Sequence, residues 1–167
     1  MNKFRKISLC LIILLSITTI TANAQEKVTP QEVIQKAREA SAFLQKNGKK
    51  GLKEFMDKNS RWVWKDTYIF IMNCKSETVA AHPFKSKLVG KKLMGLKDIN
   101  GRFFFAEFCA AAEDQKGGWV EYMWQKIGEE IPSRKISYLL QVPETIYQVG
   151  VGIYDDTISI EELNKFK

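Results

Sequence analysis

Five segments that follow residue 61 combine aromatic side chains with the two-residue periodicity of β-strands. They are Trp62–Ile71, Ala80–Pro83, Gly117–Trp124, Lys135–Tyr138 and Gly150–Tyr154. Because alternate residues of a strand point to opposite faces of a sheet, these segments predict a sheet with two distinct faces. Tyrosines, a lysine and the single histidine recur among them, and this mixture of apolar and polar groups favours a pocket for a small ligand.

The spacing of apolar and turn-forming residues predicts the remaining elements. Thr29-Pro30-Gln31-Glu32 is a capping box followed by apolar residues at helical spacing, and Asn47-Gly48 ends the run. We expect a long helix at 31–46, further helices at 51–57, 102–114 and from 159 onward, and strands at 62–74, 78–81, 119–124, 134–142 and 146–154. This order predicts an α+β fold, in which the long N-terminal helix packs on a central antiparallel sheet.

The strand expected at 62–74 carries apolar side chains on both faces. Trp64, Tyr68, Phe70 and Met72 share one face, whereas Val63, Ile69 and Ile71 share the other. Neither face is polar enough to meet solvent, so this strand is expected in the interior of the sheet.

The N-terminus has the three parts of a signal peptide, which we assign to residues 1–24. Lys3, Arg5 and Lys6 form a basic region, Ile7–Ile17 an apolar region, and Ala22-Asn23-Ala24 a cleavage signature. The apolar run is shorter than the ~20 residues that span a bilayer, which favours cleavage over the alternative, an uncleaved anchor. We therefore expect a periplasmic or secreted protein whose single domain covers residues 25–167.

Charge and cysteine content exclude several function classes. The formal net charge is +7, of which three positive charges lie in the signal segment, and the remaining bases are interleaved with acids, so nucleic acid is not an expected partner. Cys74 and Cys109 could pair in an oxidising compartment. However, they fall in an expected strand and an expected helix that nothing brings together, so we expect two buried free thiols. One histidine and two distant cysteines predict no metal site, and no cofactor is expected.

Catalysis has little support in the sequence. The motifs of serine hydrolases, zinc proteases and nucleotide-binding enzymes are missing. Asp66 and Glu121 lie within expected strands and could form a carboxylate pair, or act with His82 in a hydrolase. Salt bridges or solvent contacts are the simpler interpretation of both acids, so we do not expect an enzyme.

Two polar residues of the strand segments are candidates for ligand binding. His82 precedes Pro83 at a strand end, where its imidazole could donate to a carboxylate or could fasten the loop by bonding backbone groups. Lys135 could be a cation sheltered by aromatic rings that attracts an organic anion, or an edge-strand lysine in water. Strand alternation places Lys135 and Tyr138 on opposite faces unless a bulge intervenes.

The aromatic residues divide into two groups by their chemistry. Because a buried tyrosine hydroxyl requires a hydrogen-bond partner, Tyr68, Tyr122 and Tyr138 are better ligand candidates than the tryptophans. Trp119 and Trp124 are expected to form pocket walls or to pack the sheet.

The segments resemble the single Cache domain family, which comprises PAS-like extracytoplasmic sensor modules. The similarity covers Phe55–Asn59, Trp62–Phe70, Ala81-His82-Pro83, Leu88–Lys91, Asp98–Gly101, Gly118–Trp124, Lys135–Tyr138 and Gly150–Tyr154, in the order of the family. The resemblance implies that a helix-backed sheet binds small metabolites, such as short carboxylates or amino acids, without turnover. It also implies that the pocket is lined or closed by Tyr68, Phe70, His82, Trp119, Tyr122, Lys135 and Tyr138.

The chain departs from the family pattern in two loops. The turn at 73–78 lacks the usual glycine, and the loop at 125–132 lacks the usual prolines. The chain also ends at Lys167 without an output domain. We therefore hypothesise a freestanding exported binding module that captures a small organic anion and docks on a membrane receptor. The alternative is a structural or interaction protein of the same fold that uses its surface and binds no small ligand.

Overall fold

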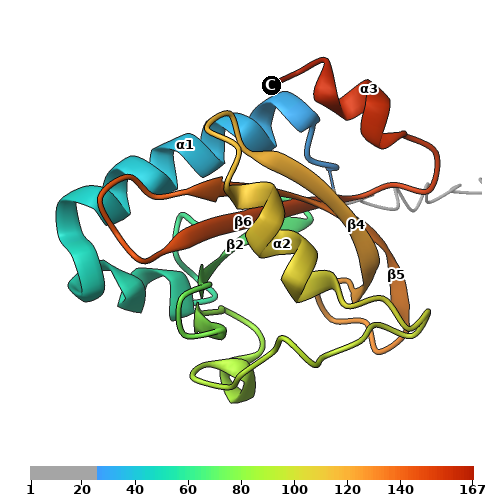
Figure 1. Ribbon diagram of the computed structural model, residues 1–167. Helices are drawn as coiled ribbons and strands as arrows, with labels where there is room; N and C mark the ends of the chain where they lie inside the picture. Colours follow the sequence, from blue (N-terminus) through green and yellow to red (C-terminus); the bar gives the residue numbers. More distant parts are fainter. Residues whose placement is uncertain (1–25) are drawn as a thin grey trace, which may run out of the picture.

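Helix α1 (Pro30–Asn47) begins near the start of the described part of the chain, residues 26–167 of a computed structural model (Figure 1). Its first turn is closed by the predicted capping box, in which the Thr29 hydroxyl accepts from the Glu32 amide. Gly48 ends the helix with a positive φ of 53°. The long helix is confirmed, whereas the signal peptide assigned to residues 1–24 lies outside the described residues.

The chain continues directly into η1 (Gly48–Met56), a 3₁₀ helix that starts earlier than the helix expected at 51–57. Its Phe55 ring stacks on Trp62 with centroids 4.9 Å apart. Phe43 of α1 packs against both rings. This aromatic cluster fixes η1 beside α1 before the chain enters the sheet.

The single strand expected at 62–74 is two strands, β1 (Val63–Trp64) and β2 (Thr67–Asn73), joined by a tight turn. Lys65 occupies this turn with a positive φ of 46°, and the chain reverses, so Trp64 pairs with Thr67. The prediction that Trp64 shares a face with Tyr68 is therefore wrong. Trp64 packs on the α1 side of the sheet, and Val63 packs on the opposite side with Tyr68.

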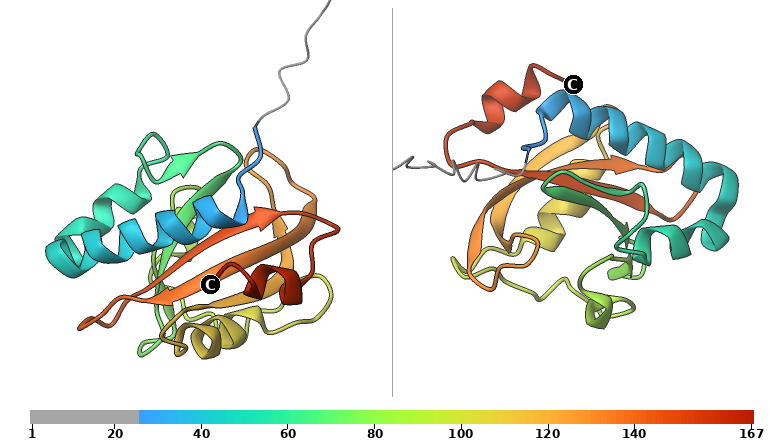
Figure 2. Two further views of the ribbon diagram at one scale, coloured as in Figure 1. Left: turned by 90° about the horizontal axis from the view of Figure 1, so that it is seen from above. Right: turned by 180° about the vertical axis from the view of Figure 1, so that it is seen from behind.

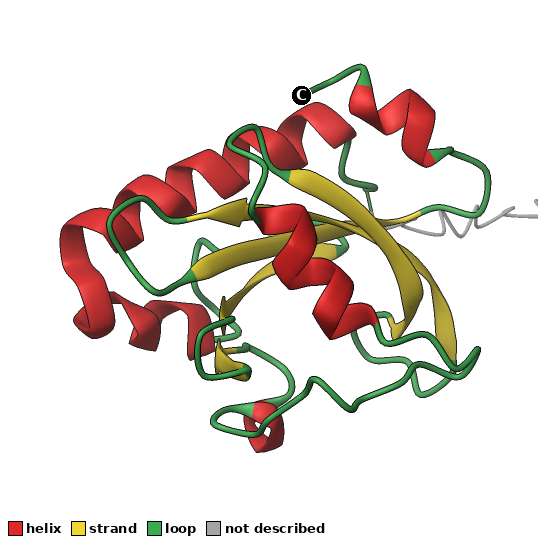
Figure 3. Ribbon diagram, viewed as in Figure 1, coloured by secondary structure: helices red, strands yellow, loops and turns green. Residues whose placement is uncertain are grey.

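The sheet is antiparallel and runs in the order β1-β2-β6-β5-β4, with β3 (Thr78–Ala81) also paired to β2. The other strands are β4 (Gly118–Gln125), β5 (Pro132–Gln141) and β6 (Gln148–Tyr154). Strand β2 therefore has neighbours on both edges, which confirms its interior position. Figure 3 shows the strongly twisted sheet with helices on both sides, and this arrangement confirms the α+β fold.

Two hydrophobic cores lie on the two faces of the sheet. On one face, α1 covers β5 and β6, and the short α3 (Ile160–Asn164) packs against β4, as the view from above shows (Figure 2). This α1-side core is filled by Val33, Ala37, Leu44, Ile69, Ile71, Ile136, Val149, Val151, Ile153 and Leu163. The other face carries Tyr68, Phe70, Met72, Val120 and Tyr122 and is covered by α2 (Phe104–Ala112).

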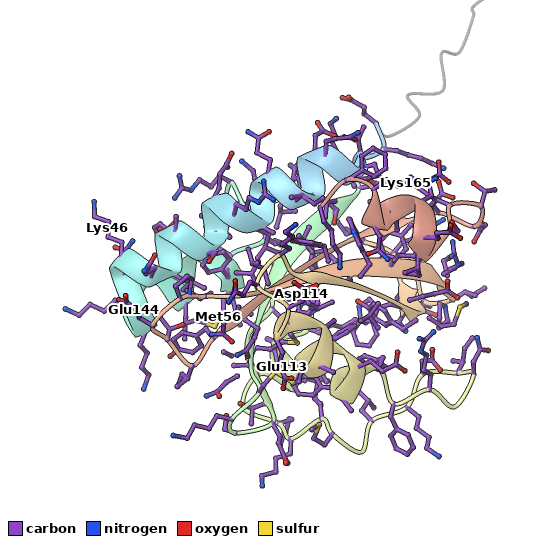
Figure 4. The ribbon with its side chains drawn as sticks, turned by 45° about the horizontal axis from the view of Figure 1, so that its top comes forward. Lys46, Met56, Glu113, Asp114, Glu144 and Lys165 are labelled. Carbon is purple, nitrogen blue, oxygen red and sulfur yellow. A yellow bond between two sulfur atoms is a disulfide. The ribbon has the colours of Figure 1, made fainter. Side chains whose placement is uncertain are left out.

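Between β3 and α2 the chain follows an irregular path with one short 3₁₀ turn, η2 (Ser86–Leu88). The turn between β2 and β3 places Glu77 at a positive φ of 62°, the conformation that the glycine expected in this family would adopt most readily. Side chains fill the spaces between these elements, while Lys46 and Glu144 point outward at the end of the molecule where α1 ends (Figure 4). None of the described helices is both long enough and apolar enough to span a membrane.

Cys74 and Cys109 form a disulfide with Cα atoms 5.7 Å apart, so the prediction of two free thiols is wrong. The pairing depends on how α2 packs across the end of β2, and periodicity within either segment does not reveal that tertiary contact. The bridge closes a loop with a sequence separation of 35 residues.

Removing this bridge should destabilise the domain. For a loop of this length, the chain-entropy relation predicts that the Cys74→Ser/Cys109→Ser variant loses about 3–4 kcal/mol of unfolding free energy. Guanidinium unfolding of the oxidised protein and of the variant measures the difference. The denaturant slope should also rise, because the unfolded variant exposes more surface. Unchanged midpoints would contradict this account of the bridge.

Candidate ligand-binding site

A cavity of about 20 Å³, which is room for about one water molecule, lies between the sheet and the segments that cover its second face. We call this second face the cavity face. The lining residues are Tyr68, Phe70, Met72, Val79, His82, Leu88, Leu93, Phe104, Phe105, Phe108, Tyr122 and Trp124. Most of the lining is therefore aromatic or aliphatic, and its polar groups come from β2, from β4 and from the loop after β3.

Two glycines of β6 make room on the cavity face. A Cβ atom at Gly150 would lie 2.2 Å from the Phe70 ring. A Cβ atom at Gly152 would lie 2.5 Å from Ser137 Oγ and 2.7 Å from Lys135 Cε. The segment Gly150–Tyr154 therefore places glycine where neighbouring side chains cross the sheet, while Val151 and Ile153 pack on the α1 side.

The Lys135 side chain runs along the cavity face over Gly152, where the missing Cβ atom leaves room for it. The side chain is 0% exposed, and its Nζ makes no hydrogen bond within residues 26–167. Three aromatic rings surround the ammonium, with centroids 4.0 Å away at Tyr68, 5.0 Å at Tyr154 and 5.7 Å at Phe70. Burial lowers the pKa of Lys135 to about 7, although the charge of Asp66 acts in the opposite direction.

Hydrogen bonds fix the tyrosines around this lysine. The Tyr68 hydroxyl accepts from Trp124 Nε1 at 2.9 Å, and the hydroxyls of Tyr122 and Ser137 share a hydrogen bond of 3.1 Å. Burial raises the pKa of Tyr68 and of Tyr122, so both hydroxyls keep their protons at neutral pH. The tyrosines can therefore donate to an anion without being ionised themselves.

His82 both fastens its loop and faces the cavity. Its Nδ1 accepts from the Phe84 and Lys85 amides, each at 3.1 Å. Burial, together with the positive charges of Lys135 and Lys85, lowers the pKa of His82 to about 3. Because Nδ1 is an acceptor in a neutral ring, Nε2 carries the proton and is a donor. A neutral ring with its proton on Nε2 can therefore fasten the loop through Nδ1 and also donate to a carboxylate through Nε2.

The structure brings together five of the seven predicted site residues. Tyr68, Phe70, His82 and Tyr122 line the cavity, and Lys135 lies against the Tyr68 and Phe70 rings. The other two, Trp119 and Tyr138, belong to the α1-side core, where their ring centroids are 5.1 Å apart. These two residues are therefore on the face of the sheet opposite the cavity.

Several residues that line the cavity or surround Lys135 were not assigned as ligand-contacting from the sequence. Tyr154 follows Gly150 and Gly152 at two-residue spacing, a signal that could have placed it on the cavity face. Phe104, Phe105 and Phe108 come from α2 and had no such signal, because a phenylalanine-rich helix face is usual in any core.

The acids considered for catalysis are engaged elsewhere. Asp66 Oδ1 accepts from the Val28 amide at 2.9 Å, and Glu121 forms an ion pair with Arg134. Glu121 alternates with Tyr122 along β4, so it points away from the cavity face and from His82. The hydrolase arrangement of His82 with Glu121 is therefore contradicted.

The chain thus combines an antiparallel sheet, backed by a long helix, with a small and mostly apolar cavity on the other face of the sheet. A family model for the Cache domain matches residues 13–165. The chain therefore belongs to the Cache domain family.

Two curated relatives share part of this chain. It is 32% identical over 96 residues to the methyl-accepting chemotaxis protein McpP of Pseudomonas putida, covering 58% of this chain and 18% of that protein. It is 30% identical over 94 residues to the sensor histidine kinase MctS of Rhizobium johnstonii, covering 56% of this chain and 20% of that protein. The matched region thus spans about a fifth of the length of either relative.

Solved structures of sensor domains have the same fold. One is a Cache chemosensory domain described for its carboxylic acid recognition, with a TM-score of 0.60, 28% identity, and coverage of 76% of this chain and 91% of that one. Another is the periplasmic sensor domain of a chemotaxis protein, with a TM-score of 0.58, 25% identity, and coverage of 75% and 90%.

The unpartnered lysine should make stability depend on pH. The unfolded chain keeps the Lys135 proton up to about pH 10.4, whereas the folded protein loses it near pH 7, so unfolding takes up a proton between these values. The unfolding free energy of the wild type should therefore rise with pH across this window. Lys135→Met should be more stable than the wild type by about 3–5 kcal/mol at pH 6.5, and by only about 1 kcal/mol at pH 9.5.

Urea unfolding of the ligand-free proteins across this pH range measures the difference. Lys75→Met is the matched control, because Lys75 is exposed in the turn after β2. Its difference from the wild type should stay constant with pH. A constant difference for Lys135→Met as well would show that Lys135 stays charged in the folded protein.

Proposed function

We propose that this Cache domain binds a small carboxylate reversibly in the cavity, as the perception step of a signalling system outside the cytoplasm. The observation that carries the proposal is the buried ammonium of Lys135, which has no hydrogen-bond acceptor among residues 26–167. The similarity to a Cache domain described for carboxylic acid recognition supports it. A carboxylate is the anion that would supply both the missing charge and the missing acceptor.

The donors around Lys135 suit the two oxygens of a carboxylate. The Lys135 ammonium lies 4.0 Å from the centroid of the Tyr68 ring, and the Tyr68 and His82 rings are 4.9 Å apart between centroids. A carboxylate held by such groups raises the lysine pKa, so the ammonium stays charged in the complex. The rings of Phe70 and Tyr122 complete the proposed site as apolar walls.

The remaining lining restricts what the carboxylate can carry. The far side of the cavity is formed by Met72, Val79, Leu88, Leu93 and three phenylalanines of α2. None of the described residues that line it is acidic, so an α-ammonium group would have no partner. We therefore propose that the ligand is an aliphatic monocarboxylate and not an amino acid or a dicarboxylate. This ligand class is narrower than the short carboxylates or amino acids expected from the sequence.

The cavity must open to admit such a ligand. Its volume of about 20 Å³ is smaller than even a two-carbon acid needs. A wider surface groove of about 390 Å³ adjoins it and shares Leu88 and Trp124 with its lining. We propose that the ligand enters through this groove when the segment around η2 moves outward.

The domain is proposed to act with a membrane receptor and not as an enzyme. The relatives that it resembles are a methyl-accepting chemotaxis protein and a sensor histidine kinase, and the matched region covers 18% and 20% of their lengths. Signal-peptide cleavage after Ala24, with residues 25–167 as the mature sensor domain, completes this proposal. Trp119 and Tyr138 are left out of the proposed site because they pack on the α1 side.

A second candidate is an interaction protein that keeps the Cache fold and binds no small ligand. The small cavity volume favours this alternative, because a closed aromatic core could serve packing alone. The two candidates differ in what they predict for Lys135, since a purely structural domain gains nothing from a buried cation without an acceptor.

The first prediction of the proposal concerns ligand choice. Calorimetric titration with acetate, propionate, butyrate, alanine and succinate should give binding to at least one monocarboxylate. Alanine should bind more than about 100-fold more weakly than propionate, because its ammonium would be buried without an acid. Lys135→Met should weaken binding by about tenfold to 100-fold, the value of a hydrogen bond to a charged group.

Lys75→Met is again the matched control and should bind like the wild type. If no acid binds and none co-purifies with the protein, the interaction-protein alternative is favoured. If Lys135→Met binds as tightly as the wild type, Lys135 is not the anchor of the carboxylate.

The second prediction concerns the pH dependence of binding. Below about pH 7, Lys135 is already charged in the free protein, so the dissociation constant should change little. Above this pH each binding event takes up a proton, and the dissociation constant should rise by up to about tenfold per pH unit. The pKa of His82 is about 3 and the tyrosine pKa values are raised, so no other cavity group titrates in this range.

Titration in buffers of different ionisation enthalpy at pH 8 measures the proton uptake directly. A dissociation constant that is level between pH 7 and pH 9, with no proton uptake, would contradict the proposed charge state of Lys135.

A further inference from the structure

The Cys74–Cys109 disulfide encloses the outer wall of the cavity. We define the outer wall as residues 75–108, the chain between the two cysteines. Seven of the twelve lining residues belong to it, namely Val79, His82, Leu88, Leu93, Phe104, Phe105 and Phe108. The other five, Tyr68, Phe70, Met72, Tyr122 and Trp124, belong to β2 and β4. The cavity is therefore enclosed between β2 and β4 on one side and one covalently closed loop on the other.

Most of the outer wall is weakly attached to the sheet. β3 pairs with β2, and two isolated bridges, Val79 with Val89 and Thr78 with Lys92, join β3 to the short segment that follows η2. Apart from these bridges and η2, the chain from His82 to α2 is irregular. In the described part of the chain, two hydrogen bonds join this stretch to β4. Lys85 Nζ donates to Gln125 Oε1 at 2.5 Å, and Asp98 Oδ2 accepts from the Met123 amide at 2.9 Å. The packing of phenyl rings completes the attachment.

The disulfide acts where the wall is otherwise held by packing alone. Cys109 directly follows Phe108, and Phe104 and Phe105 lie about one turn earlier on the same helix. Figure 1 shows α2 lying across the sheet in front of β6. The bridge to Cys74, the first residue after β2, fixes the C-terminal half of α2 to the strand that carries Tyr68, Phe70 and Met72. It thereby limits how far the aromatic rings of α2 can move from the sheet.

We propose that Cys74 and Cys109 are positioning residues of the ligand site, because their disulfide confines wall opening to the part of the loop around η2. With the bridge intact, ligand enters and leaves beside Leu88 and Trp124, while α2 stays in place. Without the bridge, α2 also separates from the sheet, and the bound ligand escapes more easily. This inference rests on the proposed binding of a carboxylate in the cavity.

The bridge and the ligand must then affect each other reciprocally. If the disulfide favours the closed wall, a ligand that also favours the closed wall protects the disulfide from attack. A ligand held under α2 should therefore slow the reaction with dithiothreitol. In that reaction the reagent supplies two electrons and two protons, the bridge becomes two thiols, and the reagent becomes its cyclic disulfide.

The test compares the dissociation rate of propionate, or of the tightest acid among acetate, propionate and butyrate, between the oxidised protein and Cys74→Ser/Cys109→Ser. Stopped-flow tryptophan fluorescence reports the rate, because Trp124 lines the cavity. The variant should release the acid at least tenfold faster, with a smaller change in the association rate. Reducing the wild type should reproduce this effect, and reoxidation should reverse it.

The control separates positioning from general loss of stability. Leu44→Ala destabilises the α1-side core, where Leu44 is 0% exposed, without touching the outer wall. This variant should keep the slow release of the oxidised wild type. Saturating acid should also slow the reduction of the wild-type bridge by dithiothreitol at least fivefold.

Three outcomes would overturn the inference. If the oxidised protein binds no acid of the set, the proposed function fails and the inference fails with it. If the acid binds but leaves the oxidised protein and the double serine variant at the same rate, only the inference fails. If Leu44→Ala accelerates release as much as the double serine variant does, the bridge acts through global stability and not through the position of α2.

Discussion

The cavity face of the sheet is arranged around a buried cation, the Lys135 ammonium, for which residues 26–167 provide no hydrogen-bond acceptor. Removing the Lys135 ammonium from water is unfavourable, and three aromatic rings within 5.7 Å compensate only in part. The lowered pKa of Lys135 has the same cause, because burial disfavours the charged form of the amine. Several features around it, including the space left by Gly152 and the fixed hydroxyls of Tyr68 and Tyr122, have a simple explanation if an anion completes the site.

Strand alternation allows the same segments to serve two purposes. On β5, Ile136 and Tyr138 fill the α1-side core, while Lys135 and Ser137 point to the cavity face. Arg134 shares the parity of Ile136 and bonds the Asp155 and Ile158 carbonyls, which holds the segment leading to α3. One strand therefore carries the proposed ligand anchor and, next to it in sequence, the residue that fixes the C-terminal segment.

Local signals in the sequence predicted those parts of the fold that depend on local chemistry. The capping box at Thr29 marked the start of α1, and two-residue spacing placed Tyr68, Phe70 and Met72 on one face of β2. The grouping of Tyr122 and Lys135 with these residues came from the family resemblance and not from spacing. Alternation also warned that Tyr138 and Lys135 face opposite ways, and the structure places Tyr138 in the α1-side core. The features that the sequence did not reveal depend on tertiary contacts or on the conformation of a single turn. The Lys65 turn moved Trp64 to the other face, and the approach of α2 to β2 joined Cys74 to Cys109.

A buried lysine with a depressed pKa is also the group that enzymes use as a nucleophile, so its surroundings must decide between catalysis and binding. Three aromatic rings surround the Lys135 amine, and Asp66, whose charge acts on it, accepts from the Val28 amide. The one imidazole already uses its acceptor nitrogen on the Phe84 and Lys85 amides. Glu121, which could act as a base, lies on the opposite face in an ion pair with Arg134. An anion entering this site would meet hydrogen-bond donors, and it would raise the pKa of Lys135 and so keep the amine protonated and unable to act as a nucleophile. The arrangement therefore favours reversible binding, in agreement with membership of a sensor family.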